Sequence, residues 1–255
     1  MISTPISGPM GRLAGLAAFL VMATGQAAAS SGSEPLWVGR FDSGLAPWQE
    51  VRLNADLKPN SFELRNWDGV PALEVRSAGS MSLLGRPVRV DLARTPVMCW
   101  RWRVDAPLQT ADMSRKSGDD YAARLYVSLA LPAAEKGLAL RAKLAIARSI
   151  WGPSVPDAAI NYVWDNRNPI GTERPNAYTD RATMVVLRSG ATDAGGWVQE
   201  RRHIGEDIAR LYGPSAQPVQ IAITADTDNT GESARAGFAD LHWVPEHSAC
   251  ATQPT

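Results

Sequence analysis

Two adjacent carboxylates, Asp119 and Asp120, precede Arg124 near the middle of the sequence. Paired carboxylates can transfer protons in acid/base catalysis or hold a cation. Neighbouring residues of a strand point to opposite faces, so both carboxylates would not readily reach one substrate atom. An enzyme that cleaves glycans with Asp119 or Asp120 would need a second, facing carboxylate, for which Asp228 is the candidate. The alternative is structural, with one aspartate capping a turn and the other pairing with an arginine.

A second group of oxygen-bearing side chains, Asp226, Asp228 and Asn229, lies in the acidic segment 226–232. Ca²⁺ takes roughly six to eight oxygen ligands and tolerates a flexible loop. The spacing is similar to the start of an EF-hand loop, but a glycine and a glutamate of that motif are misplaced and no flanking helices are expected. Since the same residue types form turns for local reasons, the segment predicts either a structural Ca²⁺ site or a simple turn.

A third group combines arginine and aromatic side chains on the expected strand faces. Guanidinium forks and aromatic rings on one face would suit a sugar or a carboxylated ligand. Tyr162 and Trp164 alternate with Asn161 and Val163, so their rings fit the core of the domain equally well. The predicted ligand contacts are Asp119, Asp120, Arg101, Arg103, Arg124, Tyr126, Tyr162 and Trp164, and Arg202 belongs to the same polar set.

The usual catalytic patterns are missing from the sequence. The three histidines, His203, His242 and His247, have no metal-ligand spacing, and the sequence has no nucleophile elbow, S-x-x-K motif or Walker loop. Lysine plus arginine and aspartate plus glutamate number 26 each. This balance gives no reason to expect a nucleic-acid partner. These observations favour a binding protein over an enzyme.

The central carboxylates precede a segment in which apolar residues occupy every second position from Tyr121 to Leu131, with Arg124, Tyr126 and Ser128 on the alternate face. A period of two over this length is typical of a half-buried strand. Short segments of the same kind, separated by Gly, Pro, Asn and Asp, occur on both sides of it. Residues 36–246 are therefore predicted to form a single mainly β domain, a two-sheet antiparallel β-sandwich.

Two segments depart from this β pattern. Residues 133–151 carry apolar residues at loose helical spacing and end at Gly152-Pro153, which is a helix stop signal. Ile204, Ile208 and Leu211 repeat at helical spacing before Gly213. The sandwich is thus expected to contain a helical insertion and one short helix.

The N-terminus predicts a secretory signal peptide over residues 1–29. Arg12 precedes an apolar run from Leu13 to about Gly25, and small residues follow as in a cleavage site. The run is shorter than the roughly 20 residues that a membrane span needs, although an uncleaved anchor is the alternative. We therefore expect a periplasmic or secreted protein with no membrane span after cleavage, a short linker at 30–35 and a polar tail at 247–255.

The two cysteines, Cys99 and Cys250, have no metal-binding spacing. An oxidising compartment permits a disulfide between them. Cys99 lies in a strand-like run and Cys250 in the polar tail, so the sequence allows this pairing without requiring it.

A series of longer motifs, rich in charged and aromatic residues, is spread over residues 100–233. They are W-R-W-R-V at 100–104, K-S-G-D-D-Y-A-A-R-L-Y-V at 116–127, N-Y-V-W-D-N at 161–166, P-N-A-Y-T-D-R-A at 175–182, V-Q-E-R-R-H-I-G-E-D at 198–207 and D-T-D-N-T-G-E-S at 226–233. Together they resemble an uncharacterised family of secreted bacterial proteins, a domain of unknown function. The resemblance implies no particular activity.

A weaker similarity concerns the two ends of the domain. The segments 41–48, F-D-S-G followed by a tryptophan, and 238–243, F-A-D-L-H-W, look like the first and last strands of jelly-roll carbohydrate-binding modules. In such modules these strands lie side by side and often share a structural Ca²⁺, which makes Asp42 and Asp240 candidate ligands by resemblance.

The predicted function is therefore non-catalytic binding of a glycan or similar polar ligand by an exported protein. The alternatives are a glycan-cleaving hydrolase or lyase and a structural or interaction protein of the cell envelope.

Overall fold

The computed structural model describes residues 1–4, 34–151 and 155–253. The chain divides into two units, Met1–Ser31 and Gly32–Thr255, and the second contains all the elements below. Most of the predicted signal peptide and linker therefore lies outside the described residues.

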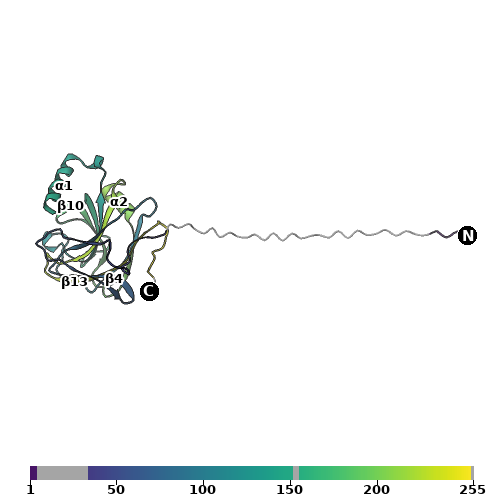
Figure 1. Ribbon diagram of the computed structural model, residues 1–255, viewed down its shortest axis with the longest axis horizontal. Coiled ribbons are helices and arrows are strands. Elements are labelled where there is room, and N and C mark those ends of the chain that lie inside the picture. Colours follow the sequence, from purple (N-terminus) through teal and green to yellow (C-terminus); the bar gives the residue numbers. More distant parts are fainter. Residues whose placement is uncertain (5–33, 152–154, 254–255) are drawn as a thin grey trace. The chain divides into compact units, whose positions relative to one another are not determined.

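The domain consists of two β-sheets with a shared core (Figure 1). The six-stranded sheet has the order β11-β6-β13-β4-β3, with β1 also paired to β13. Its strands are β1 (Leu36–Gly39), β3 (Ser61–Trp67), β4 (Val70–Ala78), β6 (Val97–Val104), β11 (Val198–His203) and β13 (Ser233–Val244). The predicted fold class, a mainly β two-sheet sandwich, is confirmed.

The seven-stranded sheet has the order β2-β5-β12-β7-β8-β10-β9. Its strands are β2 (Gln49–Val51), β5 (Leu83–Pro87), β7 (Tyr121–Ala130), β8 (Ala158–Asp165), β9 (Glu173–Asn176), β10 (Thr179–Ser189) and β12 (Gln217–Asp226). The sheet is not purely antiparallel, because β10 pairs with β8 in parallel. Parallel neighbours need a crossover connection, and here that connection contains β9, which adds to the far side of β10.

The core between the sheets is rich in aromatic side chains. Trp100 and Trp102 alternate along β6 and are fully buried. Their ring centroids are 5.8 Å apart, and the rings are arranged edge to face. Tyr162 and Trp164 of β8 contact them from the opposite sheet, each at 5.8 Å between ring centroids. Large rings remove much apolar area from water, so this group contributes strongly to the stability of the sandwich.

The predicted strand at Tyr121 is β7, the middle strand of the seven-stranded sheet. Leu125 and Val127 point into the shared core. The expectation of a half-buried strand is wrong, because the other face of β7 is also covered. Residues Val51, Leu53 and Leu57 pack over Tyr126 on that outer face, which shields polar side chains from water.

Two α-helices and two short 3-10 helices occur among the described residues. The predicted insertion begins with a 3-10 turn at Ala133–Glu135, and the helix α1 follows only at Leu138–Trp151. Gly137 separates the two pieces, as expected for a poor helix former. The predicted short helix is α2 (Ile204–Tyr212), and the second 3-10 helix is Lys116–Gly118. No described helix is long and apolar enough to cross a membrane.

Cys99 and Cys250 form a disulfide. It connects the C-terminal segment to β6, so the predicted polar tail is attached to the six-stranded sheet. Gln253 in the same segment is buried and donates its backbone N–H to Asp240. The pairing that the sequence leaves open is therefore present in the structure.

Candidate functional site

The middle strands of the seven-stranded sheet place polar side chains in register on its outer face. Since Leu125 and Val127 face the core, the alternating residues of β7 face outward. Tyr126 pairs with Asn161 of β8. Successive outward residues of a strand are about 6.8 Å apart, so these side chains form a continuous line. We call it the polar row; its members are Gln220, Ser128, Tyr126, Asn161 and Arg124.

Arg124 is the buried charge at one end of the polar row. Its Nη1 lies 2.7 Å from Asp226 and 3.7 Å from Asp119. The backbone N–H of Tyr121 donates to the other oxygen of Asp226 at 2.7 Å. The guanidinium also lies over the ring of Tyr126, 4.6 Å from its centroid. One cation thus orders two carboxylates and an aromatic ring at this point.

The electrostatic balance around Arg124 is acidic. Burial raises the pKa of Asp226 above that of an ordinary carboxyl; Arg124 opposes this effect, and Asp120 and Asp119 add to it. Burial likewise raises the pKa of Asp228, again with a contribution from Asp120. Burial works against the charge of Arg124, but Tyr126 and Asp226 raise its pKa, so the guanidinium remains charged. A single buried arginine therefore faces an excess of carboxylates.

Asn161 is buried without hydrogen-bond partners. Its exposed fraction is 0 %, and neither Oδ1 nor Nδ2 bonds to any residue that the structure describes. The same holds for Nε of Arg124. Leaving a buried polar group unpaired costs about 1–3 kcal/mol, and native proteins pair most such groups. The polar row therefore has hydrogen-bonding capacity that the described chain does not use.

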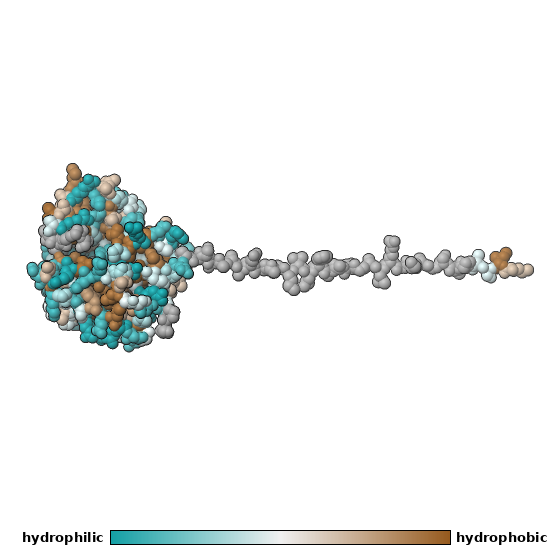
Figure 2. Space-filling view, viewed as in Figure 1, coloured by the Kyte–Doolittle hydropathy of each residue, from teal (hydrophilic) through white to brown (hydrophobic). Residues whose placement is uncertain are grey.

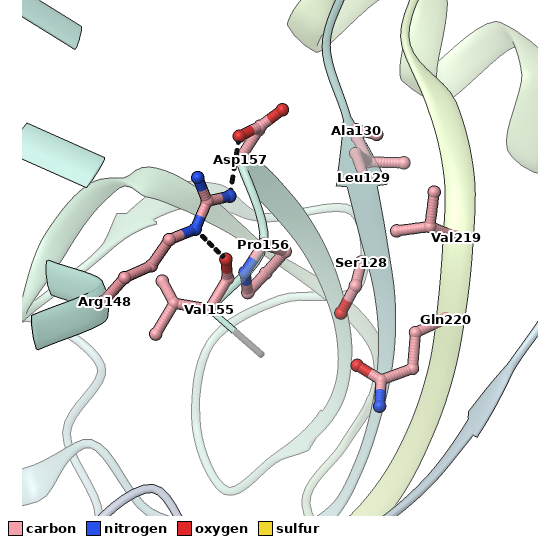
Figure 3. Close-up of a pocket in the computed structure, with 9 residues that line it drawn as sticks. All are labelled: Ser128, Leu129, Ala130, Arg148, Val155, Pro156, Asp157, Val219 and Gln220. Atoms are coloured by element: carbon pink, nitrogen blue, oxygen red, sulfur yellow. Dashed lines mark hydrogen bonds and ion pairs between the residues drawn. The ribbon is translucent and has the colours of Figure 1, made fainter. Parts of the chain in front are cut away.

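A pocket of about 200 Å³ lies at the other end of the polar row, beside Ser128 and Gln220 (Figure 3). Arg148 reaches it from α1, donates from Nε to the carbonyl of Val155 and binds Asp157, both at 3.0 Å. Asp157 also accepts from Lys136 at 2.6 Å, so its carboxylate is fixed by two cations. The pocket leads from solvent to the first members of the polar row.

The acidic end of the polar row has an exposed aromatic ring. Tyr178 is 54 % exposed, and Nζ of Lys116 lies 5.3 Å from its ring centroid. Its hydroxyl donates to Asn229 at 2.5 Å. Asn176, two residues earlier, donates to Asp119 at 2.7 Å. A planar surface and fixed polar groups thus lie together at this end.

The two adjacent aspartates have separate structural roles. Asp120 accepts the backbone N–H groups of Thr230 at 2.7 Å and Asn229 at 3.1 Å, which holds the 226–231 loop. Asp119 faces Arg124 and Asn176. These contacts match the structural interpretation of the pair, one aspartate on a turn and the other beside an arginine. Catalysis by Asp119, Asp120 and Asp228 stays a prediction.

In the predicted Ca²⁺ loop, backbone N–H groups of Asn229 and Thr230 donate to the carboxylate of Asp120. N–H donors bind anions, whereas Ca²⁺ needs oxygen ligands. Two of its three candidate ligands are occupied, because Asp226 binds Arg124 and Asn229 accepts from Tyr178. Asp228 is the only predicted ligand of this loop without such a contact, and Ca²⁺ binding by Asp226, Asp228 and Asn229 stays a prediction.

The second predicted Ca²⁺ pair, Asp42 and Asp240, is also engaged by other groups. Asp42 lies 3.2 Å from Arg40 and accepts from the hydroxyl of Ser43. Asp240 pairs with Arg101. The segment 41–48 that resembles a first strand is a loop, and it is β1, just before this loop, that pairs with β13. Ca²⁺ binding by this pair stays a prediction.

The structure does not bring the arginine and aromatic set together on one face. Arg101 and Arg103 lie in β6 of the six-stranded sheet, and Arg103 pairs with Asp68 over the ring of Trp67. Arg124 belongs to the outer face of the other sheet. Tyr162 and Trp164 point into the core, where their polar atoms bond to Asp207 and to the carbonyl of Gly190, and Arg202 also pairs with Asp207.

Several residues of the site are not among the predicted contacts. Asn161 alternates with Tyr162, and the sequence left open which of the two faces the core. The structure puts Tyr162 in the core and Asn161 on the outer face. Nothing local indicates that the other residues converge, because they come from separate strands, loops and a helix. They are Ser128, Arg148, Asp157, Asn176, Tyr178 and Gln220.

One further group of possible metal ligands occurs among the described residues. Ligand atoms of His203, Glu206 and Glu246 lie within 4.8 Å of one another. Nδ1 of His203 accepts the backbone N–H of Glu206 as the cap of α2, so Nε2 carries the proton of the neutral ring. Metal binding at Nε2 would require the cap to break, and this group gives no support for a metal site.

The chain belongs to the family described as "Protein of unknown function (DUF3047)", which matches residues 46–242. No curated protein sequence matched the chain.

Two solved structures show a distant likeness. The first is the family 30 carbohydrate-binding module of a cellulosomal cellulase of Clostridium thermocellum, with 10 % identity, TM-score 0.33, and coverage of 84 % of this chain and 95 % of that one. The second is the xyloglucanase domain of NopAA, a type three effector from Sinorhizobium fredii, in complex with cellobiose, with 10 % identity, TM-score 0.37, and coverage of 80 % and 100 %. Such low TM-scores support no inference about this chain.

Proposed function

We propose that the protein binds a neutral glycan, or a similar polar ligand, along the polar row without cleaving it. The observation that carries this proposal is the unpartnered, buried amide of Asn161 at the centre of the row. An amide offers both a donor and an acceptor, and a sugar hydroxyl can satisfy both. The pocket beside Ser128 supplies the entrance, and Tyr178 supplies a ring at the far end.

The charge of the site supports a neutral ligand over an anionic one. Asp119, Asp120, Asp226 and Asp228 surround one buried arginine, and two of these carboxylates are directly paired with it. The raised pKa values of Asp226 and Asp228 show that negative charge is already unfavourable in this desolvated site, and an anionic ligand would add more of it. An acidic glycan would therefore be rejected at this end of the row.

Ligand entry requires a local rearrangement in this proposal. Asn161 is covered, and Tyr126 above the same ladder is only 9 % exposed. The segment with Val51, Leu53 and Leu57 packs on Tyr126. This segment and the Tyr126 ring would move aside when the ligand reaches Asn161.

Export belongs to the same proposal. The predicted signal peptide at 1–29 would direct the protein to the periplasm or the medium, and the disulfide Cys99–Cys250 is the kind of bond that persists in an oxidising compartment. N-terminal sequencing of the protein from a periplasmic fraction tests this part. A mature start near Ser30 would support export, and an intact Met1 in the cytoplasm would contradict it.

The structural alternative predicts a large exposed apolar patch. On the face visible in Figure 2, polar and apolar residues are interspersed. This mixed surface favours the small-ligand proposal on that face. The exposed large apolar residues between residues 34 and 253, outside the undescribed gap, include Leu36, Leu138, Ile146, Ile170, Tyr178 and Val219.

The test is calorimetric titration with a panel of neutral and acidic oligosaccharides, using the wild type, Asn161→Leu and the control Asn66→Leu. Asn66 is an exposed residue of the other sheet. We expect a neutral member to bind the wild type and the control, and to lose at least about tenfold in affinity in Asn161→Leu. Unchanged affinity in Asn161→Leu would overturn the assignment, and release of shortened product would replace the binder with the hydrolase or lyase.

A further inference from the structure

A second pocket lies apart from the polar row, where the segment after β1 approaches β5. Its volume is about 140 Å³. We call it the Arg86 pocket; the lining residues that matter here are Trp37, Arg40, Phe41, Asp42, Trp48 and Arg86.

Arg86 is a half-buried cation without a carboxylate partner. It donates to the carbonyl of Val38, which also accepts from Nε1 of Trp48 at 3.1 Å. Its Nε is buried and bonds to no described residue. Burial lowers the pKa of Arg86, and no carboxylate counteracts this effect. Arg124, by comparison, is compensated by Asp226 and Asp119.

The net charge of the Arg86 pocket is positive by one. Arg40 and Arg86 contribute two cations, and Asp42 contributes one carboxylate. Asp42 is directed toward Arg40, at 3.2 Å, and toward Ser43, which leaves Arg86 uncompensated. One negative charge would neutralise the pocket, so a monoanion fits better than a dianion. A carboxylate can accept two parallel bonds from a guanidinium.

Three aromatic side chains, Trp37, Phe41 and Trp48, form part of the pocket wall. Phe41 and Trp48 are buried, and their ring centroids lie 5.6 Å apart. Trp37 packs on His242, with Arg40 over its ring. A cavity of about 150 Å³ in another protein holds one benzene ring, so the volume here suits a body of that size. The pocket thus combines one guanidinium that has no carboxylate partner with aromatic side chains on part of an otherwise polar wall.

We propose that the Arg86 pocket binds a small monoanionic carboxylate that carries an apolar ring or chain. The carboxylate bonds to the Nη N–H groups of Arg86 that do not donate to Val38, and the ring or chain contacts Trp37 and Trp48. This site uses none of the residues of the polar row, so it stands or falls independently of glycan binding.

The experiment is calorimetric titration of the protein with benzoate and with benzamide, its neutral analogue of nearly the same shape. We expect benzoate to bind and benzamide to bind at least about tenfold more weakly, because hydrogen bonds to charged groups are the stronger ones. Equal binding of the two probes, or no binding of benzoate, would overturn the proposal.

Variants locate the site and keep the test valid if one of them unfolds. Arg86→Met removes the proposed partner but also the bond to Val38, so Arg40→Gln is the second variant, at a half-exposed side chain. Both should weaken benzoate binding, and Asp42→Asn should strengthen it several-fold by removing the competing charge. Arg89→Gln, an exposed arginine outside the pocket, is the matched control. Loss of binding only in Arg89→Gln, or weaker binding in Asp42→Asn, would contradict the assignment.

Discussion

The outer faces of the two sheets both contain buried charges, but they differ in how completely these charges are paired. On the six-stranded sheet, Glu74 has a fully buried side chain and binds Arg65 and Arg235 at 2.6 Å, and also Arg76. Burial alone would raise the pKa of Glu74; bonds from Arg235, Arg65 and Arg76 outweigh it and lower the pKa to about 2. Arg65 and Arg235 lie over the ring of Trp67, at 5.0 and 4.1 Å from its centroid.

On the seven-stranded sheet the balance is reversed. A single cation, Arg124, serves Asp226 and Asp119, and the pKa of Asp226 is raised. Asn161 nearby has two unused amide atoms. On the first face both carboxylate oxygens of Glu74 are bonded by arginines, so its charge is fully paired, although Nε of Arg65 and Nε of Arg235 are buried without a described partner. The second face leaves donors, acceptors and charge unbalanced, as expected where a ligand completes the network.

The largest change in stability is expected for Glu74→Gln, which removes the carboxylate that the three arginines share. We expect a loss of about 2–3 kcal/mol in the free energy of unfolding at pH 7, because three arginines lose their shared anion while their partial exposure softens the cost. Urea denaturation measures it. Glycan binding should be unchanged. If Glu74→Gln kept its stability but lost glycan binding, the ligand site would lie on the six-stranded sheet and not on the seven-stranded one.

The pH dependence of stability should separate the two faces. Because the pKa of Glu74 is lower in the folded state than in the unfolded state, its ionised carboxylate stabilises the fold at pH values above the unfolded pKa of 4.5. This contribution is lost as the pH falls toward the folded pKa of about 2. The raised pKa of Asp226 acts oppositely: the folded state retains its proton, so stability declines as the pH rises from the unfolded value of 3.8 through the folded pKa.

Unfolding free energies measured between pH 2 and pH 9 on Glu74→Gln and Asp226→Asn check these signs. Glu74→Gln should flatten the acid side of the profile, and Asp226→Asn should flatten the decline at higher pH. Identical profiles for the two variants would show that the faces do not differ electrostatically.

A smaller effect of opposite sign is expected for Asn161→Leu. Replacing an unpartnered buried amide by an apolar side chain of similar size should stabilise the unliganded protein by about 1–2 kcal/mol. The thermal midpoint with and without a bound glycan is the measurement. Destabilisation would mean that Asn161 has partners, such as ordered water, and that the buried polar groups of this face are also paired.

The smallest effect is expected at the pocket rim. Arg148→Met should change the free energy of unfolding by less than about 1 kcal/mol, because its side chain is 39 % exposed and Asp157 keeps Lys136. Glycan affinity should fall, since Arg148 lines the entrance. If affinity is unaffected, the ligand does not enter through this pocket.

The sequence predicted local features better than the arrangement of the site. The alternation in β7 identified the central strand, and the residue types at Asp119 and Asp120 suggested the turn and the arginine contact that the structure shows. The parallel pairing of β8 and β10 and the burial of the outer face depend on distant segments, such as the one containing Leu57. Periodicity along one strand therefore does not reveal them.

The facing of β8 shows the same limit. Tyr162 and Asn161 alternate, and a one-residue change of phase exchanges core and outer face. The aromatic residues suggested a ligand surface, but their large apolar area places them in the core, which leaves the less conspicuous asparagine on the outer face. Only the cross-strand register with Tyr126 identifies it.

The most direct test of the difference between the faces is hydrogen–deuterium exchange of the protein with and without a bound neutral glycan. We predict slower exchange on binding in β7 and β8, residues 121–130 and 158–165, and in the segment around Leu53 that covers Tyr126. Exchange in β3 and β4, around Trp67 and Glu74, should not change. Protection confined to β3 and β4 would contradict the account, because it would place the ligand on the face whose charges are already paired.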